Sequence, residues 1–341
     1  MTTMQIRDVS LFIQVIGQGY PLLLMHGGPG LDHTSLLPLQ PLADQFTLIF
    51  YDHRCNGRSD GEPVSSMTFY NLTADAEALR QTLGFEKWAV LGHSFGGNVA
   101  LEYALRYPSS LSHLILMDTG GDQWWVNRNA SEILAKRGYS PATVQAARRF
   151  YNGQVTPSEY LRTVMKFMGA YFYRNLFLEM AHDVFSPGPR PKMRPEATIF
   201  GYSQLLQGWT VMDRLREIQV PTLVMGGRED FLFPPEHQAI LADRIPNAQL
   251  EIIERAGHNP QMERPAEVIQ RIKRFLGTAN PGCAEPRRYG MKWSKQPEGH
   301  DDDETNTRLA SRFDRWTVRG RIVHRHARWP AADHARVVQP P

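Results

Sequence analysis

The chain has 341 residues, of which 42% are hydrophobic and 10% aromatic, enough to bury the core of one large domain with an insertion, or of two domains. Its two cysteines, Cys55 and Cys283, form neither a disulfide framework nor a metal quartet. The sequence has no signal peptide and no apolar run near the roughly 20 residues of a membrane span, so we expect a cytoplasmic protein with no membrane partner.

The net charge of +3 belongs to the end of the chain. Residues 281–341 hold 12 Lys and Arg against 8 Asp and Glu, so residues 1–280 carry a net charge of −1. A nucleic-acid partner would have to bind this last segment alone, and we expect none. Without clear periodicity, residues 281–341 are predicted to be a disordered or non-native extension, whose removal leaves activity unchanged.

The first elements in the chain predict the start of a sheet. Residues 4–7 and 11–16 are typical of a hairpin, and the unbroken apolar run 21–25 is typical of a strand that is covered on both faces. The loop His26-Gly27-Gly28-Pro29-Gly30 follows this run. Its main-chain amides are accessible, so Gly28, or alternatively Gly27, is a candidate donor for an oxyanion hole.

A short helix is predicted at residues 35–43, a buried strand at 46–51 and an amphipathic helix at 68–83. The polar loop 52–60 after the strand contains His53 and Cys55. These two residues lack a third group that would make a thiol nucleophile, so the loop is interpreted as structural.

The centre of the sequence is Gly92-His93-Ser94-Phe95-Gly96. A strand at residues 88–91 precedes it, and a helix at residues 98–105 follows. Gly-x-Ser-x-Gly between a strand and a helix is the pattern of a nucleophile elbow, in which the serine hydroxyl stands above the sheet edge. The Phe95 amide at the start of the helix is then the second candidate oxyanion donor.

After a strand at 111–117, residues 121–205 change character. Helical stretches rich in aromatic residues predict a helical lid, in which Trp124, Trp125 and Phe172 are candidate substrate contacts, and residues 186–191 form a rigid linker. The predicted core domain comprises residues 1–120 and 206–280.

Strand and helix alternation resumes in the last part of the core. Helices are predicted at 209–216, 235–245 and 265–275, and strands at 222–225 and 250–253. Asp230 follows the first of these strands and His258 the second, so both reach the sheet edge that carries Ser94. Ser94, Asp230 and His258 are therefore predicted to be nucleophile, orienting carboxylate and general base; Asp118 is the competing acid.

Residues 4–278 resemble the α/β-hydrolase superfamily of serine hydrolases. The loop of residues 26–30 and the pattern Asp52-x-Arg54-x-x-Gly57-x-Ser59 are similar to the proline iminopeptidase branch. The resemblance implies a mostly parallel eight-stranded sheet flanked by helices, with a helical lid, and it assigns the same triad and oxyanion hole. It also implies a lid carboxylate for the substrate amine, for which Glu196 is the first candidate, before Glu179 and Asp183.

The elbow Gly92-His93-Ser94-Phe95-Gly96 departs from that branch and resembles esterases and lactonases. The prediction is a serine hydrolase that cleaves an ester or lactone of a small, partly apolar substrate through an acyl-enzyme on Ser94. The alternatives are a proline iminopeptidase and a non-catalytic or slow-turnover small-molecule receptor on a hydrolase scaffold. No cofactor and no metal are expected, and the sequence makes no prediction of the oligomeric state.

Overall fold

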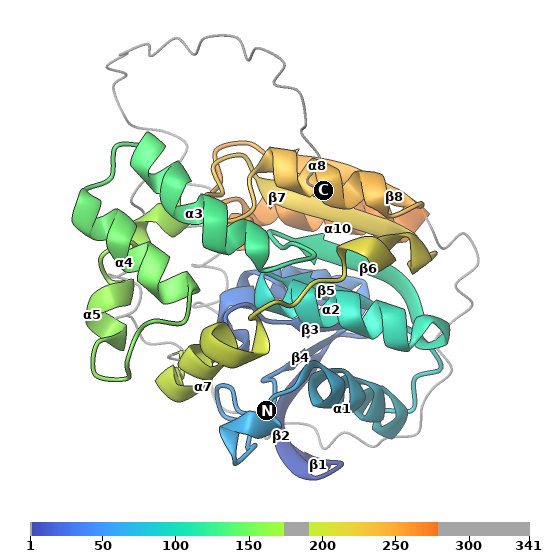
Figure 1. The fold of residues 1–341 in the computed structure, drawn as a ribbon. Coiled ribbons are helices and arrows are strands. Elements are labelled where there is room, and N and C mark those ends of the chain that lie inside the picture. Colours follow the sequence, from blue (N-terminus) through green and yellow to red (C-terminus); the bar gives the residue numbers. More distant parts are fainter. Residues whose placement is uncertain (1, 174–190, 279–341) are drawn as a thin grey trace, which may run out of the picture. The chain divides into compact units, whose positions relative to one another are not determined.

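The computed structural model describes residues 2–173 and 191–278. Their strands form one eight-stranded sheet in the order β1-β2-β4-β3-β5-β6-β7-β8 (Figure 1). Only the β1–β2 and β2–β4 pairs are antiparallel. The strands are β1 (Thr2–Ile6), β2 (Val9–Ile16), β3 (Tyr20–Met25), β4 (Phe46–Tyr51), β5 (Trp88–His93), β6 (Leu111–Met117), β7 (Thr222–Gly227) and β8 (Ala248–Ile253). The predicted mostly parallel eight-stranded sheet is confirmed.

Burial along the strands follows their position in the sheet. Near the edge, β2 alternates between buried and half-buried residues, whereas all six residues of β5 in the centre are buried. A parallel strand covered on both faces needs a continuous apolar sequence, which the runs in β3 and β5 provide.

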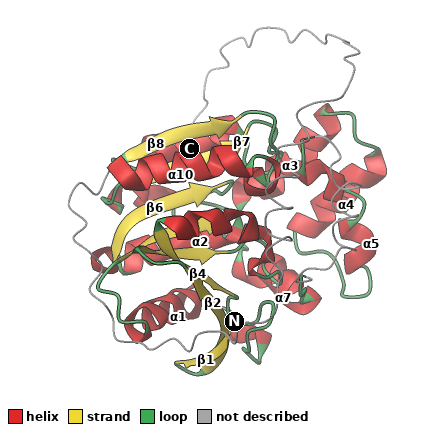
Figure 2. Cartoon of the chain, turned by 180° about the vertical axis from the view of Figure 1, so that it is seen from behind, coloured by secondary structure: helices red, strands yellow, loops and turns green. Residues whose placement is uncertain are grey.

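Helices cover both faces of the sheet (Figure 2). The helices α1 (Phe69–Thr82), α2 (Phe95–Arg106) and α8 (Pro235–Arg244) pack into the apolar core on one face. The 3₁₀-helix η1 (His33–Asp44) and α10 (Pro265–Thr278) pack into the core on the other face. In α10 the buried apolar residues recur at helical spacing, which gives the helix one apolar stripe; they are Val268, Ile272, Phe275 and Leu276.

The chain between β6 and β7 is mostly helical where it is described. Its elements are α3 (Trp124–Lys136), α4 (Pro141–Tyr151), α5 (Tyr160–Val164), η4 (Met168–Tyr171), α7 (Pro195–Phe200), the π-helical η5 (Gly201–Leu205) and the 3₁₀-helical η6 (Met212–Glu217). Many of their apolar side chains form a cluster with residues 231–233, which follow β7. The division into a core and a lid remains a prediction. Glu179, Asp183, Cys283, most of the predicted linker 186–191 and residues 281–341 lie outside the described residues.

The remaining described elements are short, and two of the predicted helices differ from the structure. The short elements are the 3₁₀-helices η2 (Val64–Ser66) and η3 (Pro108–Ser110), and the helix α9 (Pro260–Glu263). The helix predicted at 35–43 is 3₁₀-helical, because Pro38 and Pro41 lack the N–H groups that an α-helix uses. The helix predicted at 209–216 is reduced to η6, because Thr210 pairs with Asp122 in a β-bridge.

None of the helices in the two described ranges is long and apolar enough to cross a membrane.

Candidate active site

Ser94 lies in a strained turn between β5 and α2. Its φ of 53° and ψ of −120° are unusual for a residue with a side chain. The turn is held in place by the Ser94 N–H, which donates to the Met117 carbonyl at 3.0 Å, and by the Ser94 carbonyl, which accepts from the Gly97 N–H at 2.8 Å. Ser94 itself is half-buried. The sequence therefore folds at this point into the elbow that its glycine spacing predicts.

The two flanking glycines are required by close backbone contacts. A Cβ atom on Gly96 would collide with the Met25 carbonyl at the end of β3, and one on Gly92 would collide with the Gly96 carbonyl. Glycine is the one residue without a Cβ atom, so only glycine lets α2 begin this close to the sheet.

The structure brings Ser94, His258 and Asp230 into one chain of hydrogen bonds. His258 Nε2 lies 2.9 Å from Ser94 Oγ, and His258 Nδ1 lies 2.9 Å from Asp230 Oδ2. The other carboxylate oxygen of Asp230 accepts from the Leu232 N–H at 2.8 Å. Burial alone would raise the pKa of Asp230, but His258 and the Leu232 N–H hold that pKa below its ordinary value. Asp230 is therefore a carboxylate that can orient the imidazole.

The main chain of His258 is fixed on both sides. Its N–H donates to the Tyr171 carbonyl at 2.8 Å, and its carbonyl accepts from His93 Nε2 at 2.8 Å. Burial lowers the pKa of His93 to about 3, so this ring is neutral and carries its proton on Nε2. His93 thus joins the elbow to the loop that holds His258, a role that sequence reasoning did not assign to it.

The candidate oxyanion donors lie in the elbow itself and in the loop that follows β3. Phe95 is the first residue of α2, where an N–H group has no acceptor within the helix. A Cβ atom on Gly27 would lie 3.1 Å from the Ser94 Cβ atom and 2.7 Å from His93 Nδ1, so this loop passes directly beside the elbow. Gly28 has a φ of 62°, which favours glycine. The donor roles of Gly27, Gly28 and Phe95 remain predictions.

The polar loop 52–60 is tied to its neighbours by hydrogen bonds, as expected for a structural loop. Asp52 accepts from the Arg58 N–H at 2.8 Å and from His33 Nδ1 at 2.6 Å. The His53 N–H donates to His26 Nε2 at 3.1 Å, at the base of the 26–30 loop. Burial raises the pKa of the Cys55 thiol, which disfavours the reactive thiolate.

The predicted substrate contacts lie in different surroundings. Trp125 Nε1 donates to the Leu232 carbonyl at 3.1 Å, two residues from Asp230. The Phe172 main chain lies against Gly257, which precedes His258. Trp124 is 62% exposed and stacks with Arg128, and Glu196 is exposed on the first turn of α7. The structure thus brings Trp125 and Phe172 near the triad loops, and places Trp124 and Glu196 at the surface of the described residues.

Glu263 is a half-buried neighbour of the site that no sequence pattern singles out. Its carboxylate accepts from the Tyr173 N–H at 2.7 Å and from the Gly257 N–H at 2.6 Å. Burial raises its pKa to about 7, although both N–H groups act in the opposite direction. Both donors are main-chain groups, and main-chain donors leave no side-chain pattern in a sequence. Only the fold reveals this contact.

Asp118, Asp230 and His258 are the one group of described residues whose potential ligand atoms lie close enough for a metal, within 4.8 Å of one another. A neutral imidazole has one lone pair. His258 Nδ1 faces Asp230, so the lone pair is on Nε2, which faces Ser94. We therefore assign no metal to this cluster.

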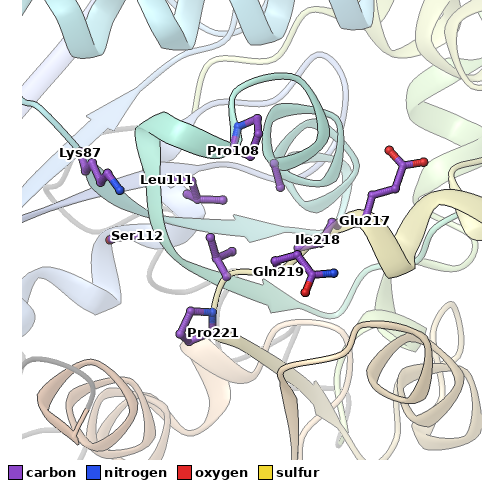
Figure 3. A pocket seen from close by; sticks show the side chains of 10 residues that line it. Lys87, Pro108, Leu111, Ser112, Glu217, Ile218, Gln219 and Pro221 are labelled. Carbon is purple, nitrogen blue, oxygen red and sulfur yellow. The ribbon is translucent and has the colours of Figure 1, made fainter.

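A pocket lies at the opposite edge of the sheet (Figure 3). Its lining residues come from the segments that enter β5, β6 and β7 and from the end of α2; they are Lys87, Ala104, Pro108, Leu111, Ser112 and 217–221. Ser94, Asp230 and His258 instead follow the carboxyl ends of β5, β7 and β8, where ligands bind in open α/β sheets. The pocket is therefore separate from the candidate active site.

Comparison with known proteins identifies the family. The sequence model of the alpha/beta hydrolase fold family matches residues 20–265, which is most of the chain. The chain belongs to this family. As a hydrolase of this fold, it is 29% identical to a proline iminopeptidase of Clostridioides difficile over 80% of this chain and 96% of the relative.

Two solved structures extend the comparison. A proline iminopeptidase from Mycobacterium smegmatis has a TM-score of 0.64 and 25% identity, and covers 82% of this chain and 98% of its own. A thermophilic esterase from Thermogutta terrifontis has a TM-score of 0.60 and 26% identity over the same shares. The hydrolase is thus similar to both classes of enzyme.

Proposed function

We propose that the chain is a serine hydrolase that cleaves an ester or lactone through an acyl-enzyme on Ser94. The observation that supports this proposal is the continuous chain of hydrogen bonds from Asp230 through His258 to Ser94. A serine hydroxyl is a weak nucleophile at neutral pH, and an imidazole held by a carboxylate is the group that activates it.

The mechanism uses each of these groups twice. Ser94 Oγ attacks the carbonyl carbon while His258 Nε2 takes the hydroxyl proton, and Asp230 stabilises the imidazolium. The Phe95 and Gly28 N–H groups stabilise the oxyanion. His258 then gives the proton to the leaving alcohol, and a water molecule activated by the same imidazole releases the acid. Each oxyanion donor is worth roughly 3 to 4 kcal/mol in enzymes of this kind.

The surroundings of His258 favour an apolar substrate. The Tyr171 ring lies 5.3 Å and the Phe233 ring 6.0 Å from the imidazole, between ring centroids. Phe231, directly after Asp230, is fully buried against Tyr171. An acyl or alcohol group of a small, partly apolar ester would meet aromatic rather than charged side chains here.

The second candidate is a proline iminopeptidase, because the relative and one of the structures above carry that name. An aminopeptidase needs an anionic group for the free amine of its substrate. Glu196 is our candidate for this role, although it is exposed on α7. Ester cleavage does not need such a group, which is why we place it first.

The test compares turnover of p-nitrophenyl butyrate and of proline p-nitroanilide by the purified chain. We expect ester turnover without anilide cleavage, and a loss of at least about 10⁴-fold in kcat for Ser94→Ala. The control is Ser158→Ala, which changes an exposed serine and should leave turnover unchanged. Labelling of wild type but not Ser94→Ala by a fluorophosphonate would place the nucleophile independently.

Other outcomes would reject the first proposal. Cleavage of the proline anilide by the wild type, with a higher KM in Glu196→Gln, would establish the aminopeptidase. Small-molecule binding without turnover or labelling would support a receptor on a hydrolase scaffold.

A further inference from the structure

Asp118 is a buried acid next to the candidate triad. The proposed mechanism gives this acid no role. It directly follows β6, is fully buried and has a φ of 47°. Its N–H donates to the Met225 carbonyl at 2.8 Å, and its Oδ1 accepts from the Gly227 N–H at 2.8 Å. Both partners belong to β7, the strand that leads to Asp230. The position of Asp118 is therefore fixed relative to the end of β7.

The Asp118 carboxyl group lies close to the Asp230 carboxylate. One oxygen of each carboxyl group lies within 4.8 Å of the other, and Asp118 Oδ2, which is fully buried, receives no hydrogen bond from an N–H or hydroxyl group of the described residues. Two buried carboxylates this close to each other repel strongly, so one of them must hold a proton, which can then form a hydrogen bond to the other.

The surroundings decide which acid is protonated. Burial and the negative charge of Asp230 raise the pKa of Asp118 well above its ordinary value. Asp230 has His258 and the Leu232 N–H as partners, and these hold its pKa low. The pair thus carries one negative charge, on Asp230. The proton lies on Oδ2 of Asp118, the oxygen that receives no other hydrogen bond.

We propose that Asp118 is a positioning residue, a neutral carboxylic acid that donates a hydrogen bond to the Asp230 carboxylate and fixes its orientation toward His258. This inference rests on the proposed function of Ser94, Asp230 and His258. Asp118 keeps its proton throughout the reaction, while the Ser94 proton moves only to and from His258. The acid after β6 and the acid after β7 act together, so they are not competing candidates for one role.

Two substitutions distinguish a neutral, hydrogen-bonding Asp118 from an ionised Asp118. Asp118→Asn keeps both bonds, because its amide oxygen accepts from Gly227 and its NH₂ donates to Asp230. Asp118→Gly removes the side chain at a φ that glycine tolerates, so backbone strain does not add to the effect. Melting temperatures of both variants establish that they fold.

The measurements are kcat, KM and the pH profile of kcat/KM with p-nitrophenyl butyrate. For Asp118→Gly we expect kcat to fall roughly tenfold, the equivalent of one hydrogen bond, with KM unchanged. Without its donor the Asp230 carboxylate stabilises the imidazolium more strongly, so the acid limb of the profile moves to higher pH. Asp118→Asn should keep the wild-type kcat and acid limb. A shifted acid limb in Asp118→Asn, or an unshifted one in a folded Asp118→Gly, would overturn the proposal.

A second readout does not depend on activity. The infrared spectrum of the wild type minus that of Asp118→Asn should contain the C=O band of a protonated carboxylic acid at pH 7. The protonated fraction of Glu263 is common to both proteins and cancels. Absence of the band would reject the neutral acid even if the chain proves to be an esterase, and its presence without ester turnover would reject only the proposed function.

Discussion

The backbone of Ser94 carries the strain of the candidate nucleophile. A side chain at φ 53° and ψ −120° costs of order 1–3 kcal/mol, and only the surrounding hydrogen bonds maintain this geometry. The Met117 carbonyl and the Gly97 N–H supply two of these bonds. The same geometry that exposes the hydroxyl to His258 therefore lowers the stability of the fold.

We accordingly expect Ser94→Gly to be more stable than Ser94→Ala by about 1 kcal/mol. Both variants lose the hydroxyl, but only glycine relieves the strain, and the greater entropy of its unfolded chain offsets part of the gain. Urea denaturation of the two variants in parallel measures the difference in free energy of unfolding. An alanine variant as stable as the glycine variant would mean that Ser94 is not strained.

The contacts of single residues also explain what the sequence could predict about the site. Ser94 follows β5 directly, and Asp230 and His258 lie in the loops that follow β7 and β8, so a local pattern was enough to bring them to one sheet edge. His93 and Glu263 act through hydrogen bonds with main-chain groups, of which those at His258 and Tyr173 are 165 and 90 residues away in the sequence. Such bonds depend on the tertiary path of the backbone, and no spacing of residue types predicts them.

At the scale of elements, α9 joins the 171–173 segment to the loop that contains His258. Glu263 at the end of α9 holds the Tyr173 and Gly257 N–H groups. Its pKa rises from the ordinary 4.5 to about 7, mainly through burial; Arg264 lowers it and the charge of Asp230 raises it. The contribution of Glu263 to stability is thus fully present below pH 4.5 and is lost as the pH rises through 7.

We expect Glu263→Gln to gain stability relative to wild type as the pH rises from 5 to 8, by up to about 3 kcal/mol. The hydrogen bond lost in the variant lowers its free energy of unfolding by a constant amount at every pH. The quantity to measure by urea denaturation is therefore the slope, against pH, of the difference in free energy of unfolding between the variant and the wild type. Glu254→Gln is the control. The pKa of the exposed Glu254 is lowered from its ordinary 4.5 by its hydrogen bond with Arg228. Glu254 is therefore ionised in the folded and the unfolded chain from pH 5 to 8, and the stability difference for its variant should stay nearly constant over this range. A flat difference for Glu263→Gln would refute the raised pKa.

Gly257 sets how closely the 171–173 segment approaches the His258 loop. A Cβ atom at this position would lie 2.5 Å from the Tyr171 carbonyl oxygen, which also accepts from the His258 N–H at 2.8 Å. Gly257→Ala should therefore displace His258 and lower kcat roughly 10- to 100-fold. Steady-state kinetics with the preferred substrate measures this effect.

The matched control is Gly277→Ala in α10, where an added Cβ atom meets nothing within 4 Å. This variant should keep full activity and gain up to about 0.5–1 kcal/mol from better helix propensity. If Gly257→Ala keeps wild-type kcat, the contact with Tyr171 does not position His258.

At the scale of the whole molecule, composition and periodicity predicted the sheet because buried parallel strands need continuous apolar runs, and these runs are plain in β3, β4, β5 and β6. The region between β6 and β7 was harder to predict in detail. Its helices pack on residues 231–233, and helical periodicity reveals an apolar face without revealing its partner. For the same reason the substrate contacts among Trp124, Trp125, Phe172 and Glu196 could be proposed only as a group.

We expect the folded hydrolase to end with α10. The proline iminopeptidase structure is matched over 98% of its length by 82% of this chain, and α10 ends at Thr278. A chain that stops at Thr278 should therefore keep wild-type kcat/KM and melting temperature.

A chain that stops at Arg264 loses the buried Val268, Ile272, Phe275 and Leu276. Each of these side chains contributes roughly 1.5–3 kcal/mol when buried, so together they match the whole stability of a typical domain. The chain that stops at Arg264 should therefore not fold. Circular dichroism melts and ester turnover of both truncations decide the matter, and a large loss in the chain that stops at Thr278 would show that residues beyond it stabilise the hydrolase.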